Sequence, residues 1–260
     1  MLDVFTDAAI EAGRAIMEIY NAGAEVRLKQ DQSPVTLADE RAEEIIAKVL
    51  GAVYPDIPMV AEEAAAAGHI PDTSDGRFFL VDPLDGTKEF INRSEDFTVN
   101  IALIENGRPV AGVVYAPARH VLYRGDATIA EKVVLDGSGK VVETHNIKVR
   151  PCGSDLTAVA SRSHNTPETD DFIRSNSIQN YRSVGSSLKF CLIAEGDADV
   201  YPRFGRTMEW DTAAGDAVVR AAGGMTVTSS GQPLSYGKRN QASDSDFANP
   251  GFICWGRTAQ

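Results

Sequence analysis

The sequence has few of the residues that build disulfide-rich, zinc-binding or polyanion-binding proteins. Its 260 residues include 3 cysteines and 4 histidines, and none of them shows the spacing of a metal site. We therefore expect reduced thiols rather than disulfides or zinc ligands. Positive charge is also scarce, because 25 basic side chains against 37 acidic ones leave a net charge of −12. An acidic protein does not attract polyanions, so the charge excludes nucleic acid as a partner and argues against binding to an anionic membrane surface.

The chain also lacks a hydrophobic run long enough to cross a membrane. Near the N-terminus it carries Asp3, Asp7 and Glu11, where a secretory signal would carry positive charge. We expect no integral membrane segment and a cytoplasmic protein. Hydrophobic residues make up 43% of the chain, which is enough for a full core.

Hydrophobic periodicity predicts two lobes. The first, residues 1–150, has helices at about 3–20 and 38–50 and strands at about 59–61, 78–81, 97–104, 110–115 and 121–124. The second, residues 151–260, alternates strands at 158–160, 199–201 and 225–228 with helices at 168–174, 187–195 and 212–222. A polar, turn-rich stretch at 240–250 reads as a surface loop. The fold class is therefore α/β, with an α+β first lobe.

Residues 80–90, Leu-Val-Asp-Pro-Leu-Asp-Gly-Thr-Lys-Glu-Phe, are the most informative segment. Asp82 follows a buried strand, which Pro83 is expected to end because proline cannot donate to a sheet. Asp85 can converge with Asp82 on hard divalent cations, and the Leu84 carbonyl can add a third oxygen. Gly86 permits close approach to a ligand, and Thr87 offers a hydroxyl at the start of a possible phosphate-binding helix. This pattern predicts metal-assisted phosphoryl transfer to water.

The same run also fits an ordinary acidic turn in which an aspartate caps a helix. Three other acids bear on this choice: Asp39 at the head of a helical pattern, Glu62 after a short apolar stretch, and Asp211 at the start of a small-residue helix. Each alone could be a capping or surface acid. Because all of them fall at the ends of elements, where side chains can converge, we favour a shared site.

These segments resemble the lithium-sensitive, magnesium-dependent superfamily of inositol monophosphatases. The resemblance rests on residues 82–87, on the pair Glu62-Glu63 and on residues 210–214, Trp-Asp-Thr-Ala-Ala. Residues 86–91, 185–190 and 201–205 are similar to the CysQ-type branch of 3'(2'),5'-bisphosphate nucleotidases. Ala61 stands where many relatives have glycine, and Arg206 where the branch often has proline. The resemblance implies the layered αβαβα sandwich of the inositol monophosphatase and fructose-1,6-bisphosphatase type.

The resemblance also implies roles for single residues and two or three Mg²⁺ ions. Asp82 would bridge two ions, with Glu62 and the Leu84 carbonyl on one and Asp85 and Asp211 on the other. Thr87 and Asp39 would form a hydrogen-bonded pair that orients the attacking water together with Glu62, although a helix cap bonded to a neighbouring hydroxyl would look the same. The expected substrate contacts are Gly86, Thr87, Ser163, His164, Ser186, Lys189 and Arg203.

The implied substrate is a small bisphosphate nucleotide. Inositol monophosphatases present an acid to sugar hydroxyls shortly before the Trp-Asp motif, whereas this chain has Arg203, which suits a second phosphate. The expected activity is hydrolysis of the 3'-phosphate of 3'-phosphoadenosine 5'-phosphate to AMP and phosphate, in sulfur assimilation. An inositol or sugar monophosphatase is the alternative enzyme, and a non-catalytic regulatory binding protein is the alternative outside enzymes. Two points stay open: monomer or homodimer, and peripheral attachment to the cytoplasmic face of the inner membrane.

Overall fold

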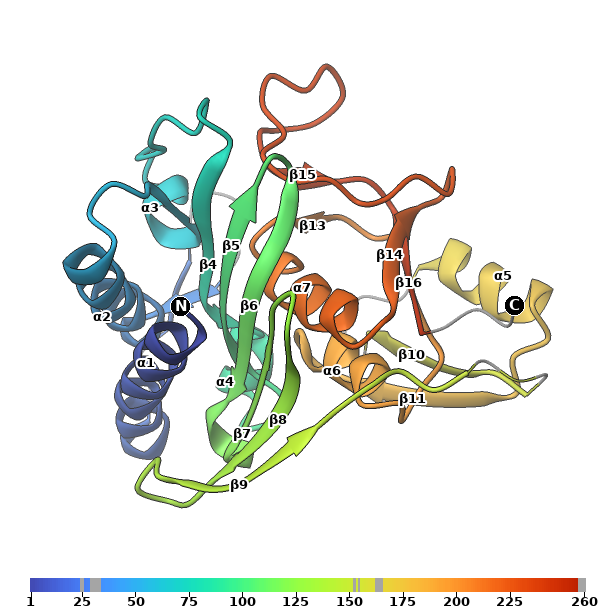
Figure 1. The fold of residues 1–260 in the computed structure, drawn as a ribbon, viewed down its shortest axis with the longest axis horizontal. Coiled ribbons are helices and arrows are strands. Elements are labelled where there is room, and N and C mark those ends of the chain that lie inside the picture. The colour runs from blue at the N-terminus through green and yellow to red at the C-terminus, as the bar shows by residue number, and fades with distance from the viewer. Residues whose placement is uncertain (24–25, 29–33, 152, 154, 162–165, 257–260) are drawn as a thin grey trace.

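The protein is built of five alternating layers of helix and sheet. The structure, a computed structural model, describes residues 1–23, 26–28, 34–151, 153, 155–161 and 166–256. Helices α1 (Leu2–Ala22) and α2 (Leu37–Val53) cover one face of a seven-stranded sheet (Figure 1). Helices α6 (Leu188–Ala194) and α7 (Ala213–Ala221) lie between it and a five-stranded sheet, and α5 (Pro167–Ser175) covers the outer face. The expected αβαβα sandwich is confirmed.

The seven-stranded sheet is antiparallel except where its first two strands pair in parallel, and its strands follow chain order. They are β3 (Met59–Ala61), β4 (Arg77–Asp85), β5 (Thr98–Glu105), β6 (Arg108–Ala116), β7 (Val121–Gly125), β8 (Ala130–Leu135) and β9 (Val141–Asn146). Two short helices start where β3 and β4 end: α3 (Glu62–Ala66) and α4 (Thr87–Ile91). Residues at these two junctions therefore lie at the same edge of the sheet.

The five-stranded sheet is mixed and has the order β11-β10-β12-β16-β14. Its strands are β10 (Thr157–Ser161), β11 (Asn180–Val184), β12 (Val200–Arg203), β14 (Met225–Thr228) and β16 (Phe252–Trp255). Two small sheets pair β1 (Val26–Leu28) with β2 (Pro34–Thr36) and β13 (Thr207–Met208) with β15 (Ala248–Asn249); a 3₁₀ turn spans Pro117–Arg119. The strands of one large sheet come from residues 59–146 and those of the other from 157–255, but the division into two domains stays a proposal. Among the described residues, no helix is both long and apolar enough to span a membrane.

Small residues set the position of α7 between the sheets. A Cβ atom at Gly112 of β6 would lie 2.7 Å from the Ala214 carbonyl oxygen and 2.8 Å from the Ala217 Cβ. Real Cβ atoms do not approach so closely, so only glycine lets the helix pack directly on the strand. The small-residue helix expected from the sequence therefore holds Asp211, which precedes it, against the seven-stranded sheet.

Two expectations about strands and loops were wrong. Strand β4 does not end at residue 81, because Asp82 pairs with Asn100 and Asp85 pairs with Thr98. Three steps along β4 thus match two steps along β5, which is a β-bulge, and Pro83 sits in the bulge instead of ending the strand. The stretch 240–250 is not all surface loop, since Phe247 is 1% exposed and residues 248–249 form β15.

Candidate active site

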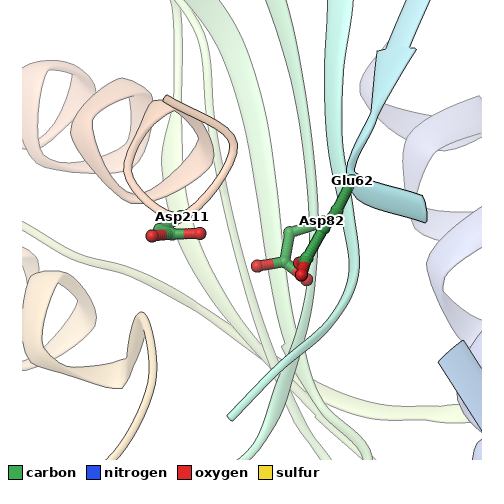
Figure 2. Close-up of side chains that lie close together, drawn as sticks. All are labelled: Glu62, Asp82 and Asp211. Atoms are coloured by element: carbon green, nitrogen blue, oxygen red, sulfur yellow. The ribbon is translucent and has the colours of Figure 1, made fainter. Parts of the chain in front are cut away.

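Three carboxylates from separate segments meet in one cleft. Glu62 is the first residue of α3, Asp82 lies in the bulge of β4, and Asp211 precedes α7 (Figure 2). One oxygen of each lies within 4.8 Å of the others. Burial, and then the charges of Asp85 and Glu62, raise the pKa of Asp211 to about 8. Such repulsion is relieved by a bound cation, and oxygen-only donors suit a hard divalent one. The cluster could therefore hold a metal ion.

Asp85 and Leu84 lie beside this cluster but make other contacts. The Asp85 carboxylate accepts hydrogen bonds from Ser187 Oγ at 2.9 Å and from Asn100 Nδ2 at 3.4 Å. Burial raises the pKa of Asp85, while the charge of Lys189 opposes this shift. The Leu84 amide donates to Asp82 Oδ1 at 3.0 Å, which fixes the bulge around the Asp82 carboxylate. Metal ligation by Asp85 and by the Leu84 carbonyl stays a prediction.

Thr87 and Asp39 form the expected hydrogen-bonded pair. Thr87 Oγ1 lies 3.1 Å from Asp39 Oδ1 and 3.3 Å from the Leu84 carbonyl oxygen. The other oxygen, Asp39 Oδ2, accepts from the Thr36 amide at 2.8 Å and completes a capping box at the start of α2. One oxygen thus belongs to the helix cap and the other to the pair with Thr87, while the orientation of water by that pair stays a prediction. Since Asp39 is 2% exposed, its carboxylate is held firmly toward Thr87.

The cleft has two walls, one formed by residues 62–89 and the other by residues 186–212. The second wall carries buried cations. Lys189 is 5% exposed, and its Nζ donates to the carbonyls of Val184 and Ser186. Burial lowers the pKa of Lys189 to about 8, although Asp85 partly offsets the effect. Arg203 is 8% exposed, and its guanidinium donates to the carbonyls of Gly205 and Arg206, which orients the group.

The two walls enclose one cavity of about 290 Å³. Its lining includes Glu62, Asp82, Leu84, Asp85, Gly86, Thr87, Ser186, Lys189, Arg203 and Asp211. The structure thus gathers most of the sequence-predicted site around one cavity, with Asp39 behind Thr87. Ser163 and His164 lie outside the described residues.

Gly86 and Ser186 meet where the two walls touch. Gly86 has φ 93°, and a Cβ there would lie 3.1 Å from the Asp96 carbonyl oxygen and 3.4 Å from Ser186 Cβ. Glycine is needed here by the backbone and by the neighbouring chain. Ser186 has φ 48°, and its buried Oγ has no hydrogen-bond partner within the described part of the chain. A buried hydroxyl in this state is suited to bind a ligand.

Ser187 and Asn100 are part of the site but were not predicted. Ser187 Oγ lies 2.7 Å from the Asp211 carbonyl oxygen, and Asn100 Nδ2 donates to Ser187 Oγ at 2.9 Å. Ser187 thereby joins Asp85 on β4 to Asp211 before α7. The sequence could have indicated Asn100, because a side-chain amide within the apolar run of residues 97–104 is expected to be buried and to need a hydrogen-bond partner. Ser187 lies in the family-like segment 185–190, but a serine at a helix start is ordinary and gave no reason to single it out.

Comparison with known proteins agrees with this geometry. The model of the inositol monophosphatase family matches residues 1–253. The chain is 45% identical over 254 residues to the 3'(2'),5'-bisphosphate nucleotidase CysQ of Salmonella typhimurium, covering 97% of this chain and 98% of that protein. The crystal structure of CysQ from Bacteroides thetaiotaomicron superposes with a TM-score of 0.78 at 38% identity, covering 98% of this chain and 97% of the other. An inositol monophosphatase from Thermotoga maritima gives 0.77 at 25%, with 98% and 91% covered. The chain belongs to the inositol monophosphatase family.

Proposed function

We propose that this protein is a magnesium-dependent 3'(2'),5'-bisphosphate nucleotidase. It would hydrolyse the 3'-phosphate of 3'-phosphoadenosine 5'-phosphate to AMP and phosphate, as part of sulfur assimilation in the cytoplasm. The observation that carries the proposal is the pairing, in one cavity, of a carboxylate cluster with the buried cations Lys189 and Arg203. The cluster serves the reacting phosphate, and the cations serve a second phosphate of the same molecule. The Salmonella typhimurium relative is named as a 3'(2'),5'-bisphosphate nucleotidase, which supports the proposal.

Glu62, Asp82, Asp85, Asp211 and the Leu84 carbonyl would hold two or three Mg²⁺ ions. When bound, Mg²⁺ supplies positive charge to the reacting phosphate and lowers the pKa of the attacking water. Because all the donors are oxygens and several carboxylates crowd together, they suit Mg²⁺ better than a thiophilic metal.

Thr87 and Asp39 would orient the attacking water through hydrogen bonds. The Thr87 hydroxyl donates a hydrogen bond to Asp39 Oδ1, so the lone pairs of Thr87 Oγ1 can accept a hydrogen bond from water. Glu62 can accept the second hydrogen of that water. The water oxygen, so oriented, attacks phosphorus as one of its protons passes to Glu62. The bond from phosphorus to the ribose 3'-oxygen breaks, and that oxygen takes up a proton from solvent. Gly86 and Thr87 would contact the phosphate.

Lys189, Arg203 and Ser186 would bind the part of the nucleotide that does not react. With a pKa of about 8, Lys189 is protonated at neutral pH, and a bound phosphate dianion would favour that form further. Charge-assisted hydrogen bonds from these buried cations are stronger than those in water. The acid that would bind inositol hydroxyls is replaced by Arg203, which favours the nucleotide over inositol phosphate.

Truncation of Arg203 on two substrates tests the proposal. Arg203→Gln should lower kcat/KM for 3'-phosphoadenosine 5'-phosphate by roughly 10-fold to 100-fold, since a charge-assisted contact contributes about 1.5 to 3 kcal/mol. Turnover of p-nitrophenyl phosphate, which has no second phosphate for Arg203 to bind, should change little. The exposed Arg182→Gln, outside the cavity, is the charge-matched control. Equal losses on both substrates would mean that Arg203 supports the fold or the metal site, and would favour the inositol or sugar phosphatase.

A further inference from the structure

The short helix that carries Glu62 cannot cap its own N-terminus. Helix α3 has five residues, too few to persist without outside contacts. Its N-cap residue is Ala61, which has the extended backbone of a capping residue, φ −124° and ψ 153°, but no side-chain acceptor. The amides at the second and third helical positions must therefore find acceptors elsewhere.

Glu43 supplies both acceptors from a neighbouring helix. Its Oε2 accepts from the Glu63 amide at 2.8 Å, and its Oε1 accepts from the Ala64 amide at 2.9 Å. One carboxylate thus replaces the missing cap, and its negative charge also suits the positive end of a helix. Glu43 lies in α2, which runs beside α3 (Figure 1).

The same helix holds the other group proposed to orient the water. Asp39 and Glu43 are four residues apart on α2, so they project from the same face about one turn apart. Asp39 binds Thr87, and Glu43 binds the two amides that follow Glu62. Helix α2 therefore sets the distance between the Thr87 hydroxyl and the backbone of Glu62.

We infer that Glu43 is a positioning residue that determines the metal affinity of the cleft by holding Glu62 in place. Glu62 lies within 4.8 Å of two other carboxylates, and their repulsion pushes it away unless its backbone is fixed. Glu43 binds the amides of Glu63 and Ala64, so it fixes the backbone that directly follows Glu62. The inference rests on the proposed metal site, but not on the identity of the substrate.

The test is a calorimetric titration of the purified protein with Mn²⁺. It measures the dissociation constant directly and needs no turnover. In Glu43→Gln, one acceptor oxygen becomes an NH₂ group that faces an amide, so one of the two bonds is lost. We expect the dissociation constant for Mn²⁺ to rise about 10-fold, the lower end of what lost supporting contacts cost a metal site. In Mg²⁺, kcat should fall while KM for the nucleotide stays near that of the wild type. The exposed neighbour Glu44→Gln, which carries the same charge change on the same helix, should bind Mn²⁺ as the wild type does.

A second-site change separates positioning from general stability. Adding Ala61→Ser to Glu43→Gln gives α3 a hydroxyl of its own for the freed amide, without restoring the charge. We expect this double variant to regain part of both the Mn²⁺ affinity and the melting temperature. Glu43→Asp, which keeps both oxygens on a shorter chain, should fall between the wild type and Glu43→Gln.

Three results would overturn the inference. One is a Glu43→Gln variant whose Mn²⁺ affinity stays within two-fold of the wild type while its melting temperature falls. Another is a double variant that regains melting temperature but not affinity. Absence of Mn²⁺ binding in the wild type would refute the metal site itself, whereas failure to hydrolyse the nucleotide with normal Mn²⁺ binding would refute only the proposed substrate.

Discussion

Removal of the Ser187 hydroxyl should weaken the contact between the two walls of the cleft. Ser187 is 2% exposed, and its Oγ lies close to the Asp211 carbonyl, the Asp85 carboxylate and Asn100 Nδ2. A hydroxyl carries one proton, so at any moment it donates to one acceptor and accepts from Asn100. Ser187→Ala therefore removes two hydrogen bonds, not three. At about 1 kcal/mol each, the free energy of unfolding should fall by about 2 kcal/mol.

Thermal unfolding in a chelator measures this loss without the stabilisation that a bound metal adds. For a chain of this size, about 2 kcal/mol corresponds to a fall of about 4 to 8 °C in melting temperature. The exposed Ser175→Ala at the end of α5 controls for the serine-to-alanine change. A melting temperature for Ser187→Ala within about 1 °C of the control would refute the reasoning, because the hydroxyl would then join nothing of consequence.

Three further predictions follow from the site and the fold. Asp82→Asn should abolish most metal-dependent hydrolysis, but the metal-free variant should be at least as stable as the wild type because one charge leaves the crowded cluster. Activity assays with and without Mg²⁺ test the first part, and melting in a chelator tests the second. Near-normal activity would contradict the ligand role. Thr87→Ala should lower kcat far more than it changes KM, since the hydroxyl is proposed to orient water and not to bind substrate; a change in KM alone would show the opposite. Burial raises the pKa of Asp199, but hydrogen bonds from Arg150 and the Thr157 amide outweigh it and hold the pKa below its usual range. This carboxylate therefore stabilises the fold above its ordinary pKa of about 3.9 and loses that contribution as the pH falls through its lowered pKa. Urea unfolding should show a lower free energy of unfolding for Asp199→Asn than for the wild type at pH 7, and the difference should shrink below about pH 4.

Much of the fold could be predicted because its buried elements repeat their apolar residues regularly. Helix α2 buries residues at helical spacing, whereas strands β5 and β6 are nearly continuous apolar runs that are buried on both faces. Strands β9 and β11 were missed for the opposite reason. All six residues of β9 are exposed, as are four of the five in β11, so neither strand shows the alternation that marks a half-buried strand. Only backbone pairing with a neighbour makes them strands.

The bulge at Asp82 shows where local rules failed within the site. Proline ends most strands, and nothing in residues 80–85 reveals that β5 pairs on both sides of Pro83. The family pattern named the carboxylates correctly as neighbours, and Glu62, Asp82 and Asp211 do meet. It assigned no role to Glu43 or Ser187, because their partners are backbone groups and a carboxylate far away in the chain.

The cavity is proposed to prefer a nucleotide with two phosphates over an inositol phosphate. The most direct test measures kcat/KM of the wild type, in Mg²⁺, for 3'-phosphoadenosine 5'-phosphate and for inositol 1-phosphate side by side. With Lys189 and Arg203 both serving the second phosphate, the nucleotide should be preferred by at least about 100-fold. Equal or better turnover of inositol 1-phosphate would contradict the account.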